Sequence, residues 1–212
     1  MKETLASITH AMAYVNKLRG DDVTYLILPS DHFIEPFDMF VEDIKKGMNL
    51  LKAHPTKFLL YGIKPTEPSP EFGYIKTKQI DGLHYVETFV EKPPVEKAQL
   101  IYNQDNYFWN NFVMLLKAPL VFDALKELIP SQYELVNKYL ENKITTKEFF
   151  NQTFVQNFSK AILEKQQNML LVPSHYTWFD IGNFDSLFRV LKHLGKDQEI
   201  EKIKELLKKA AL

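Results

Sequence analysis

Two aspartates each follow an apolar run that is typical of a buried strand. Asp31 comes after "VTYLILP" (residues 23–29) and Ser30, and Asp180 lies in "WFDIGNFDSL", before a glycine turn and a helical pattern. In an open α/β sheet, ligands bind at the carboxyl ends of strands. Two carboxylates that converge there can hold Mg²⁺ together with phosphate oxygens. A Ser-Asp pair after a strand also caps helices, so Asp31 is informative only together with Asp180.

Three further segments carry groups that suit a phosphorylated sugar. Gly73 in "EFGYIK" lets a ligand approach the backbone, although a glycine in a strand is more often a bulge. In "FVEKPP", Glu91 can accept bonds from sugar hydroxyls while Lys92 meets a phosphate, but an isolated Glu-Lys pair is commonly a solvated charge pair. Asn110 in "YFWNNF" offers a donor and an acceptor, and equally fits a structural amide. For His32 the sequence leaves open whether the residue has a functional role or is a packing or loop histidine.

Composition excludes several classes of protein. The 212 residues are 45% hydrophobic and 25% charged, which allows one substantial core or one core with a small appendage. A net charge of -1 from 26 basic and 27 acidic residues gives no reason to expect nucleic acid or an anionic membrane as a partner. The absence of cysteine excludes disulfides, thiolate metal sites and a cysteine nucleophile. No apolar run approaches the ~20 residues of a membrane helix, and we expect a cytoplasmic protein.

The elements that must position these residues alternate along the first third of the chain. Hydrophobic periodicity predicts helices over residues 3–20 and 37–54, and continuous apolar runs predict strands over 23–29 and 57–65. The first strand has the pattern of a parallel strand that is covered on both faces. Helix and strand in alternation indicate an α/β fold.

The rest of the chain indicates a mixed sheet. Short alternating strands surround "DG" at residues 81–82, which is a hairpin signal. The further predicted elements are a helix over 94–104, a strand over 107–118, a helical stretch over 119–154 broken at Pro130, a strand and loop over 169–182, and two terminal helices.

The order of the motifs matters more than any one of them. "LPSDH", "YGIKPTEPSPEFGYI", "FVEKP", "WN" and "WFDIGNFDSL" follow one another as in one family, and the chain resembles the mannose-1-phosphate guanylyltransferases, a branch of the sugar-phosphate nucleotidyltransferases. The resemblance implies a Rossmann-like, GT-A-like nucleotidyltransferase domain over residues 1–190. It implies a mixed, mainly parallel central sheet with flanking helices, and a C-terminal amphipathic helix over residues 191–212 that packs on this domain or extends from it.

The same resemblance implies roles for the site residues. The expected reaction joins mannose 1-phosphate to the α-phosphorus of GTP, giving GDP-mannose for polysaccharide biosynthesis and releasing pyrophosphate. Asp31 and Asp180 would bind Mg²⁺ at the phosphates, and Lys92 would contact the sugar phosphate. The residues implied for substrate binding are Ser30, Gly73, Tyr74, Glu91 and Asn110. The implied partners are GTP and mannose 1-phosphate, with no nucleic acid and no membrane, and a homo-oligomer is left open.

Three departures from the family pattern allow two interpretations of the chain. The family's first strand and glycine-rich nucleotide loop are missing, Phe112 stands where the family has a glycine, and Ser159 stands where it often has an aspartate. An N-terminally incomplete enzyme explains these departures, and so does an inactive or regulatory sugar-phosphate-binding homologue; a protein linked to phosphomannose isomerase fits less well. Loss of the first strand is expected to expose a sheet edge.

Overall fold

The computed structural model describes residues 3–210, which divide into two compact units. Unit 1 contains residues 3–28 and 43–174, and unit 2 contains residues 29–42 and 175–210. The expected domain boundary at residue 190 stays a prediction.

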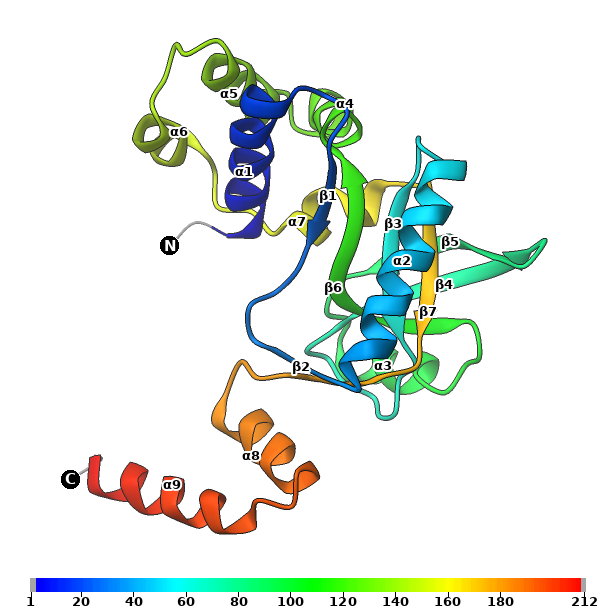
Figure 1. Ribbon diagram of the computed structural model, residues 1–212, viewed down its shortest axis with the longest axis vertical. Coiled ribbons are helices and arrows are strands. Elements are labelled where there is room, and N and C mark those ends of the chain that lie inside the picture. Colours follow the sequence, from blue (N-terminus) through cyan, green and yellow to red (C-terminus); the bar gives the residue numbers. More distant parts are fainter. Residues whose placement is uncertain (1–2, 211–212) are drawn as a thin grey trace. The chain divides into compact units, whose positions relative to one another are not determined.

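The chain contains both helices and strands, with runs of consecutive strands such as β3–β5 and a run of helices from α4 to α7 (Figure 1). The strands are β1 (Thr24–Ile27), β2 (His32–Glu35), β3 (Phe58–Ile63), β4 (Gly73–Ile80), β5 (Leu83–Val90), β6 (Tyr107–Lys117), β7 (Met169–Ser174) and β8 (Thr177–Asp180). The helices are α1 (Thr4–Arg19), α2 (Phe37–Ala53), α3 (Val95–Ile101), α4 (Ala118–Leu128), α5 (Pro130–Leu140), α6 (Thr146–Gln152), α7 (Phe158–Ala161), a 3₁₀ turn (Leu163–Lys165), α8 (Phe184–His193) and α9 (Asp197–Ala210).

Unit 1 is built on a six-stranded mixed sheet, which confirms the predicted α/β class. The strand order is β1-β6-β3-β7-β5-β4, and β6 also pairs with β4. Strands β1, β3, β4 and β7 run in one direction and β5 and β6 in the other. Among the described strands of this sheet, β3 and β7 form the one parallel pair, because β6 separates β1 from β3 and β5 separates β7 from β4. The sheet is therefore mixed, as expected, but contains more antiparallel pairs than we expected.

The expected two-sided burial of the strand over residues 23–29 is wrong. β1 pairs antiparallel with β6 and has no strand on its other edge among residues 3–210. Tyr25 and Ile27 pack against the main core, whereas Leu26 and Leu28 are 39% and 47% exposed. The continuous apolar run therefore belongs to an edge strand that packs on the core with one face and leaves the other face partly exposed.

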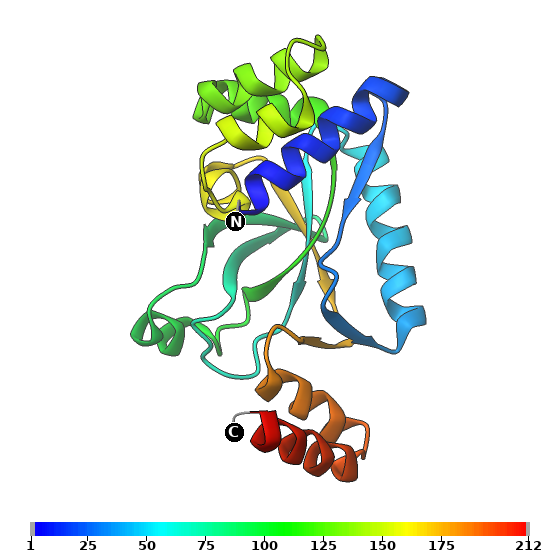
Figure 2. The same cartoon turned by 90° about the vertical axis from the view of Figure 1, so that its left-hand side faces the viewer.

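Helices cover both faces of the unit 1 sheet. On one face, α1 packs with α4, α5 and α7 over a core that includes Leu60 of β3 and Met12 of α1. On the other face, residues of α2 lie over β3, and a Cβ atom on Gly47 would meet the side chains of Leu59 and Tyr61. Figure 2 shows α1 and α2 on the two sides of the strands.

Local sequence signals within unit 1 are confirmed. Asp81 and Gly82 join β4 to β5 with φ angles of 50° and 80°, which is the left-handed backbone that a tight hairpin turn requires. The helical stretch breaks before Pro130, where α4 ends and α5 begins.

Unit 2 consists of the two-stranded β2/β8 ribbon, the first turns of α2, and helices α8 and α9. Phe33 and Phe179 face each other across the ribbon, and the ring of His193 lies 6.1 Å and 5.7 Å from theirs. Asn183 caps α8 by accepting a hydrogen bond from the backbone N–H of Ser186. The terminal helix α9 packs against α8. Within residues 3–210, none of the helices combines the length and the apolar character needed to cross a bilayer.

Candidate functional site

Asp31 and Asp180 are brought together by the β2/β8 ribbon of unit 2. The strands pair antiparallel, with His32 opposite Asp180, and the backbone N–H of Ile181 donates to the carbonyl of Asp31 at 2.8 Å. A Cβ atom on Gly182 would lie 3.0 Å from Oδ1 of Asp180, so the glycine leaves room for that carboxylate. The ribbon thus explains how two aspartates that are remote in sequence become neighbours.

His32 and Trp178 form the wall beside the two aspartates. They lie on the same face of the ribbon as Asp180, because residues two apart along a strand point to the same side. The indole Nε1–H of Trp178 donates to Nδ1 of His32 at 2.9 Å, and the two rings meet edge to face. Burial lowers the pKa of His32, and the nearby carboxylates of Asp180 and Asp31 oppose that shift.

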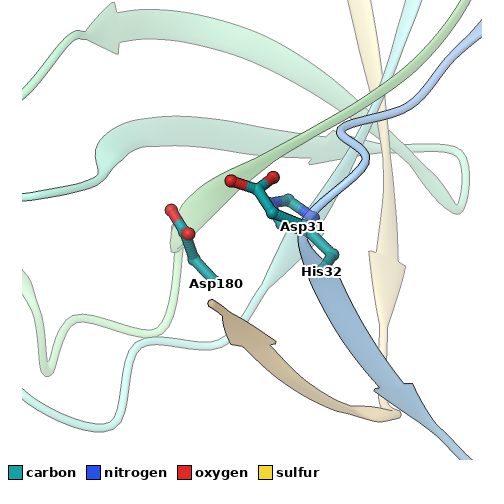
Figure 3. Close-up of side chains that lie close together, drawn as sticks. All are labelled: Asp31, His32 and Asp180. Carbon is teal, nitrogen blue, oxygen red and sulfur yellow. The ribbon is translucent and has the colours of Figure 1, made fainter. Parts of the chain in front are cut away.

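The three side chains gather at the end of the ribbon (Figure 3). One potential ligand atom from each of Asp31, His32 and Asp180 lies within 4.8 Å of the others. Asp31 is exposed and the other two are half-buried. The donor chemistry of two carboxylates fits a hard divalent cation such as Mg²⁺, which prefers oxygen ligands and keeps several waters or phosphate oxygens of its own.

A second group of predicted residues meets in unit 1. Gly73 of β4 pairs with Asn110 of β6, and Glu91 follows directly after β5. A Cβ atom on Gly73 would lie 2.8 Å from Oε2 of Glu91 and 3.3 Å from Cβ of Asn110. The missing side chain of Gly73 therefore makes space for the Glu91 carboxylate, which is a stronger reason for a glycine than the bulge we considered.

The Glu91 carboxylate is held in an unusual electrostatic setting. Its Oε2 atom is buried and has no hydrogen-bond partner among the described residues. Burial raises the pKa of Glu91, and the Glu164 carboxylate raises it further, while Lys92 and Lys160 lower it. A buried acceptor without a partner is rare in proteins and needs an explanation, such as a water or a ligand that donates to it.

The remaining predicted residues differ in how they are placed. Lys92 is exposed and adopts φ 48°, a left-handed backbone conformation that is uncommon outside glycine. Ser30 is exposed beside Asp31 in unit 2. Tyr74 is fully buried in unit 1, and its hydroxyl accepts a hydrogen bond from the backbone N–H of Ser69, so its observed contact is structural.

Phe112 also has a special backbone. Its φ angle is 56°, within the region that a glycine adopts without strain. Residues 111–113 bulge out of β6, because Leu60 and Gly62 of β3 pair with Met114 and Asn110. The Asn110 side chain supports the bulge by accepting from the backbone N–H of Phe112 at 3.1 Å. Asn110 thus has a structural role in addition to its place beside Gly73.

Sequence reasoning missed two residues next to these groups. The backbone N–H of Glu91 donates to Oε1 of Glu164 at 2.7 Å, which ties the end of β5 to the 3₁₀ turn. Trp178 was interpreted only as one residue of an apolar strand and was given no role at the site. The alternation in "TWFD" does place Trp178 and Asp180 on one strand face, but nothing in the sequence pairs that strand with residues 32–35.

The sequence of this chain matches known proteins over most of its length. The profile of the nucleotidyl transferase family matches residues 2–197. A protein of Sinorhizobium fredii (strain NBRC 101917 / NGR234) named mannose-1-phosphate guanylyltransferase is 29% identical over 197 residues, which are 89% of this chain and 38% of the relative. The xanthan biosynthesis protein XanB of Xanthomonas campestris pv. campestris (strain B100) is 30% identical over 184 residues, covering 84% of this chain and 39% of the relative. The chain therefore spans about two fifths of the length of these curated relatives.

A solved structure agrees with the fold. The crystal structure named mannose-1-phosphate geranyltransferase from Thermus thermophilus superposes with a TM-score of 0.81 at 24% sequence identity. The match covers 90% of this chain and 55% of that chain. Given the match over residues 2–197 and the shared fold, this chain belongs to the nucleotidyl transferase family.

Proposed function

We propose that this chain serves the transfer of GMP from GTP to mannose 1-phosphate, with GDP-mannose and pyrophosphate as products. Its family transfers nucleotidyl groups, and two relatives that carry the mannose-1-phosphate guanylyltransferase name are 29% and 26% identical to it. The observation that carries the proposal is the meeting of Asp31 and Asp180 at one end of the β2/β8 ribbon. Two carboxylates in that arrangement suit a cation that holds nucleotide phosphates.

The unit 1 group is assigned to the sugar phosphate. Oε2 of Glu91 is a buried acceptor with no partner among the described residues, and a sugar hydroxyl would supply the missing donor. Gly73 keeps the space beside that oxygen free of a side chain. Lys92 follows directly and offers an exposed ammonium group for the phosphate.

The unit 2 group is assigned to the nucleotide phosphates. Asp31 and Asp180 would hold Mg²⁺, which when bound offsets negative charge on the phosphates and on the leaving pyrophosphate. Gly182 leaves the Asp180 carboxylate room to reach a cation. Such a site would contribute to the reaction by orienting the nucleotide phosphates and by neutralising their negative charge.

The chemistry that these residues must support is modest. An oxygen of mannose 1-phosphate attacks the α-phosphorus of GTP, a new P–O bond forms, and the bond to the pyrophosphate oxygen breaks. No general base is required, because a sugar phosphate is already an anion at neutral pH. Lys92 offsets the negative charge of the sugar phosphate, and Glu91 orients the sugar ring through its hydroxyls.

The decisive experiment is a pyrophosphate-release assay with GTP, mannose 1-phosphate and Mg²⁺. We expect release by the wild-type chain and its loss in Asp31→Asn and Asp180→Asn, which keep the size of each side chain and remove its charge. Release that persists in both variants contradicts the assignment of the cation site. UTP, ATP and glucose 1-phosphate in parallel reactions test the choice of base and sugar.

Calorimetric binding of mannose 1-phosphate distinguishes the alternative of a binding protein. If a well-folded sample binds mannose 1-phosphate, Glu91→Gln and Lys92→Ala weaken that binding, and no pyrophosphate appears, the chain binds the sugar phosphate without completing the transfer. Both a binding homologue and an N-terminally incomplete enzyme predict that result, and activity restored by adding the family's upstream segment would identify the incomplete enzyme. Release of pyrophosphate with another nucleotide and sugar phosphate would support nucleotidyl transfer as the activity but would contradict the proposed specificity for GTP and mannose 1-phosphate.

A further inference from the structure

The hydrogen bond between Trp178 and His32 fixes which ring nitrogen of His32 carries the proton. The indole Nε1–H lies 2.9 Å from Nδ1 of His32, with the rings edge to face at 5.1 Å. An indole nitrogen can only donate a hydrogen bond, so Nδ1 must accept with its lone pair. A neutral imidazole carries one proton, and here that proton is on Nε2.

This arrangement is the reverse of the one found in metal-ligating histidines. Such a histidine binds the metal through one nitrogen and donates the N–H of the other to a carboxylate, a carbonyl or water. In His32 the lone pair of Nδ1 is used by Trp178, and Nε2 is covered by its proton. The ring therefore lies among the candidate ligand atoms, within 4.8 Å of those of Asp31 and Asp180, without a lone pair to give a cation.

We propose that His32 is a positioned N–H donor beside the carboxylate pair and not a ligand of the cation, and that Trp178 enforces this state. The inference rests on the proposed cation site of Asp31 and Asp180. It leaves that site with oxygen ligands only, which favours Mg²⁺ and Mn²⁺ over cations that prefer imidazole, such as Ni²⁺ and Zn²⁺. Trp178 is then a selectivity-determining residue that acts through His32.

The ribbon geometry explains why Trp178 can impose this tautomer. Trp178 pairs with Ile34, two residues from His32 on the same strand face, so its indole reaches the imidazole diagonally across the ribbon. Trp178 is 9% exposed, and burial keeps its ring in place. The donor is thus fixed before any ligand binds.

Nitrogen NMR of the metal-free, ¹⁵N-histidine-labelled wild-type chain at about pH 8 tests the tautomer directly. The His32 signals are assigned by their loss in His32→Gln. We expect a protonated Nε2 and an unprotonated Nδ1. A proton on Nδ1, alone or together with one on Nε2, would overturn the inference, and this result does not depend on enzymatic activity or on the proposed function.

Cation titrations test the ligand set. Mn²⁺ affinity should fall by about tenfold or more in Asp180→Asn and change by less than about threefold in His32→Gln. In Trp178→Phe the ring is free to place its proton on Nδ1, and we expect Ni²⁺ affinity to rise by about tenfold, a gain that disappears in Trp178→Phe/His32→Gln. A loss of Mn²⁺ affinity in His32→Gln equal to that in Asp180→Asn would make His32 a ligand and refute the inference. If Asp180→Asn and Asp31→Asn leave Mn²⁺ affinity unchanged, the proposed cation site fails instead, while the NMR result still decides the tautomer.

Discussion

Replacement of Gly73 by alanine should damage both folding and sugar-phosphate binding through one identifiable contact. The added methyl group would lie 2.8 Å from Oε2 of Glu91, where ordinary contact begins at 3.4 Å. The carboxylate must therefore retreat by about 0.6 Å, the difference between these two distances. The methyl group would also lie 3.2 Å and 3.3 Å from carbon atoms of Phe89 and Asn110, which limits where the strain can go.

The size of the effect follows from two opposing contributions. Overpacking of this kind costs about 1–3 kcal/mol. The loss of chain freedom in the unfolded state returns about 0.4–1 kcal/mol when glycine becomes alanine. We expect a net loss of about 1 kcal/mol, which lowers the melting temperature of a chain of this size by about 2–4 °C. Because the Glu91 carboxylate is also moved from the position proposed to hold the sugar, affinity for mannose 1-phosphate should fall as well.

A double-mutant cycle followed by circular dichroism checks the cause. In a Glu91→Ala background the carboxylate is gone, so Gly73→Ala should cost less than about 0.5 kcal/mol, giving a coupling energy of about 1 kcal/mol. Gly62→Ala is the matched control, because its methyl group would meet side-chain atoms of Leu171 and Phe108 at 2.7 Å and 2.8 Å and should cost the same in both backgrounds. An equal cost of Gly73→Ala in the two backgrounds would refute the reasoning.

Three further predictions concern caps and charges in unit 1. Thr145→Ala removes the capping box of α6 and should cost about 1 kcal/mol in urea denaturation, whereas Thr145→Ser should cost little. Burial lowers the pKa of His10, so on acidification the unfolded state takes up a proton on this residue before the folded state does. The stability that is present above about pH 6.5 is therefore lost as the pH falls through the lower pKa of the folded state. The urea midpoint of His10→Gln should depend less on pH than that of the wild-type chain. Glu164→Gln keeps an oxygen acceptor for the N–H of Glu91 but removes a negative charge, so the pKa of Glu91 should fall in a ¹³C NMR titration; an unchanged pKa would contradict the role given to Glu164.

Local patterns were enough to predict most helices and the hairpin. Apolar periodicity located α1 and α2, and "DG" located the turn between β4 and β5, because these features depend on neighbouring residues. The motif order also placed Gly73, Glu91 and Asn110 in one group, and in the structure they are in contact range. Whether they bind a sugar stays a prediction.

Nonlocal pairing limited the rest of the prediction. β2 has only four residues, and "HFIE" is too short to show a strand pattern by itself. Its pairing with β8, which comes far later in the chain, cannot be read from neighbouring residues. The exposure of Leu26 depends on what packs on each face of β1, and an apolar run cannot encode that. The bond from Trp178 to His32 depends on the same pairing, which is why residue types alone left the role of His32 open.

The β2/β8 ribbon also has a consequence for the order of events during synthesis. His32 and Trp178 are 146 positions apart, and unit 1 ends at Ser174, so the ribosome has made the whole of unit 1 before β2 can pair with β8. At typical rates of elongation, β2 waits roughly 7–30 s for its partner. A nascent chain that stops before residue 177 has Asp31 but no ribbon to hold it, so the carboxylate pair cannot form until β8 has been made.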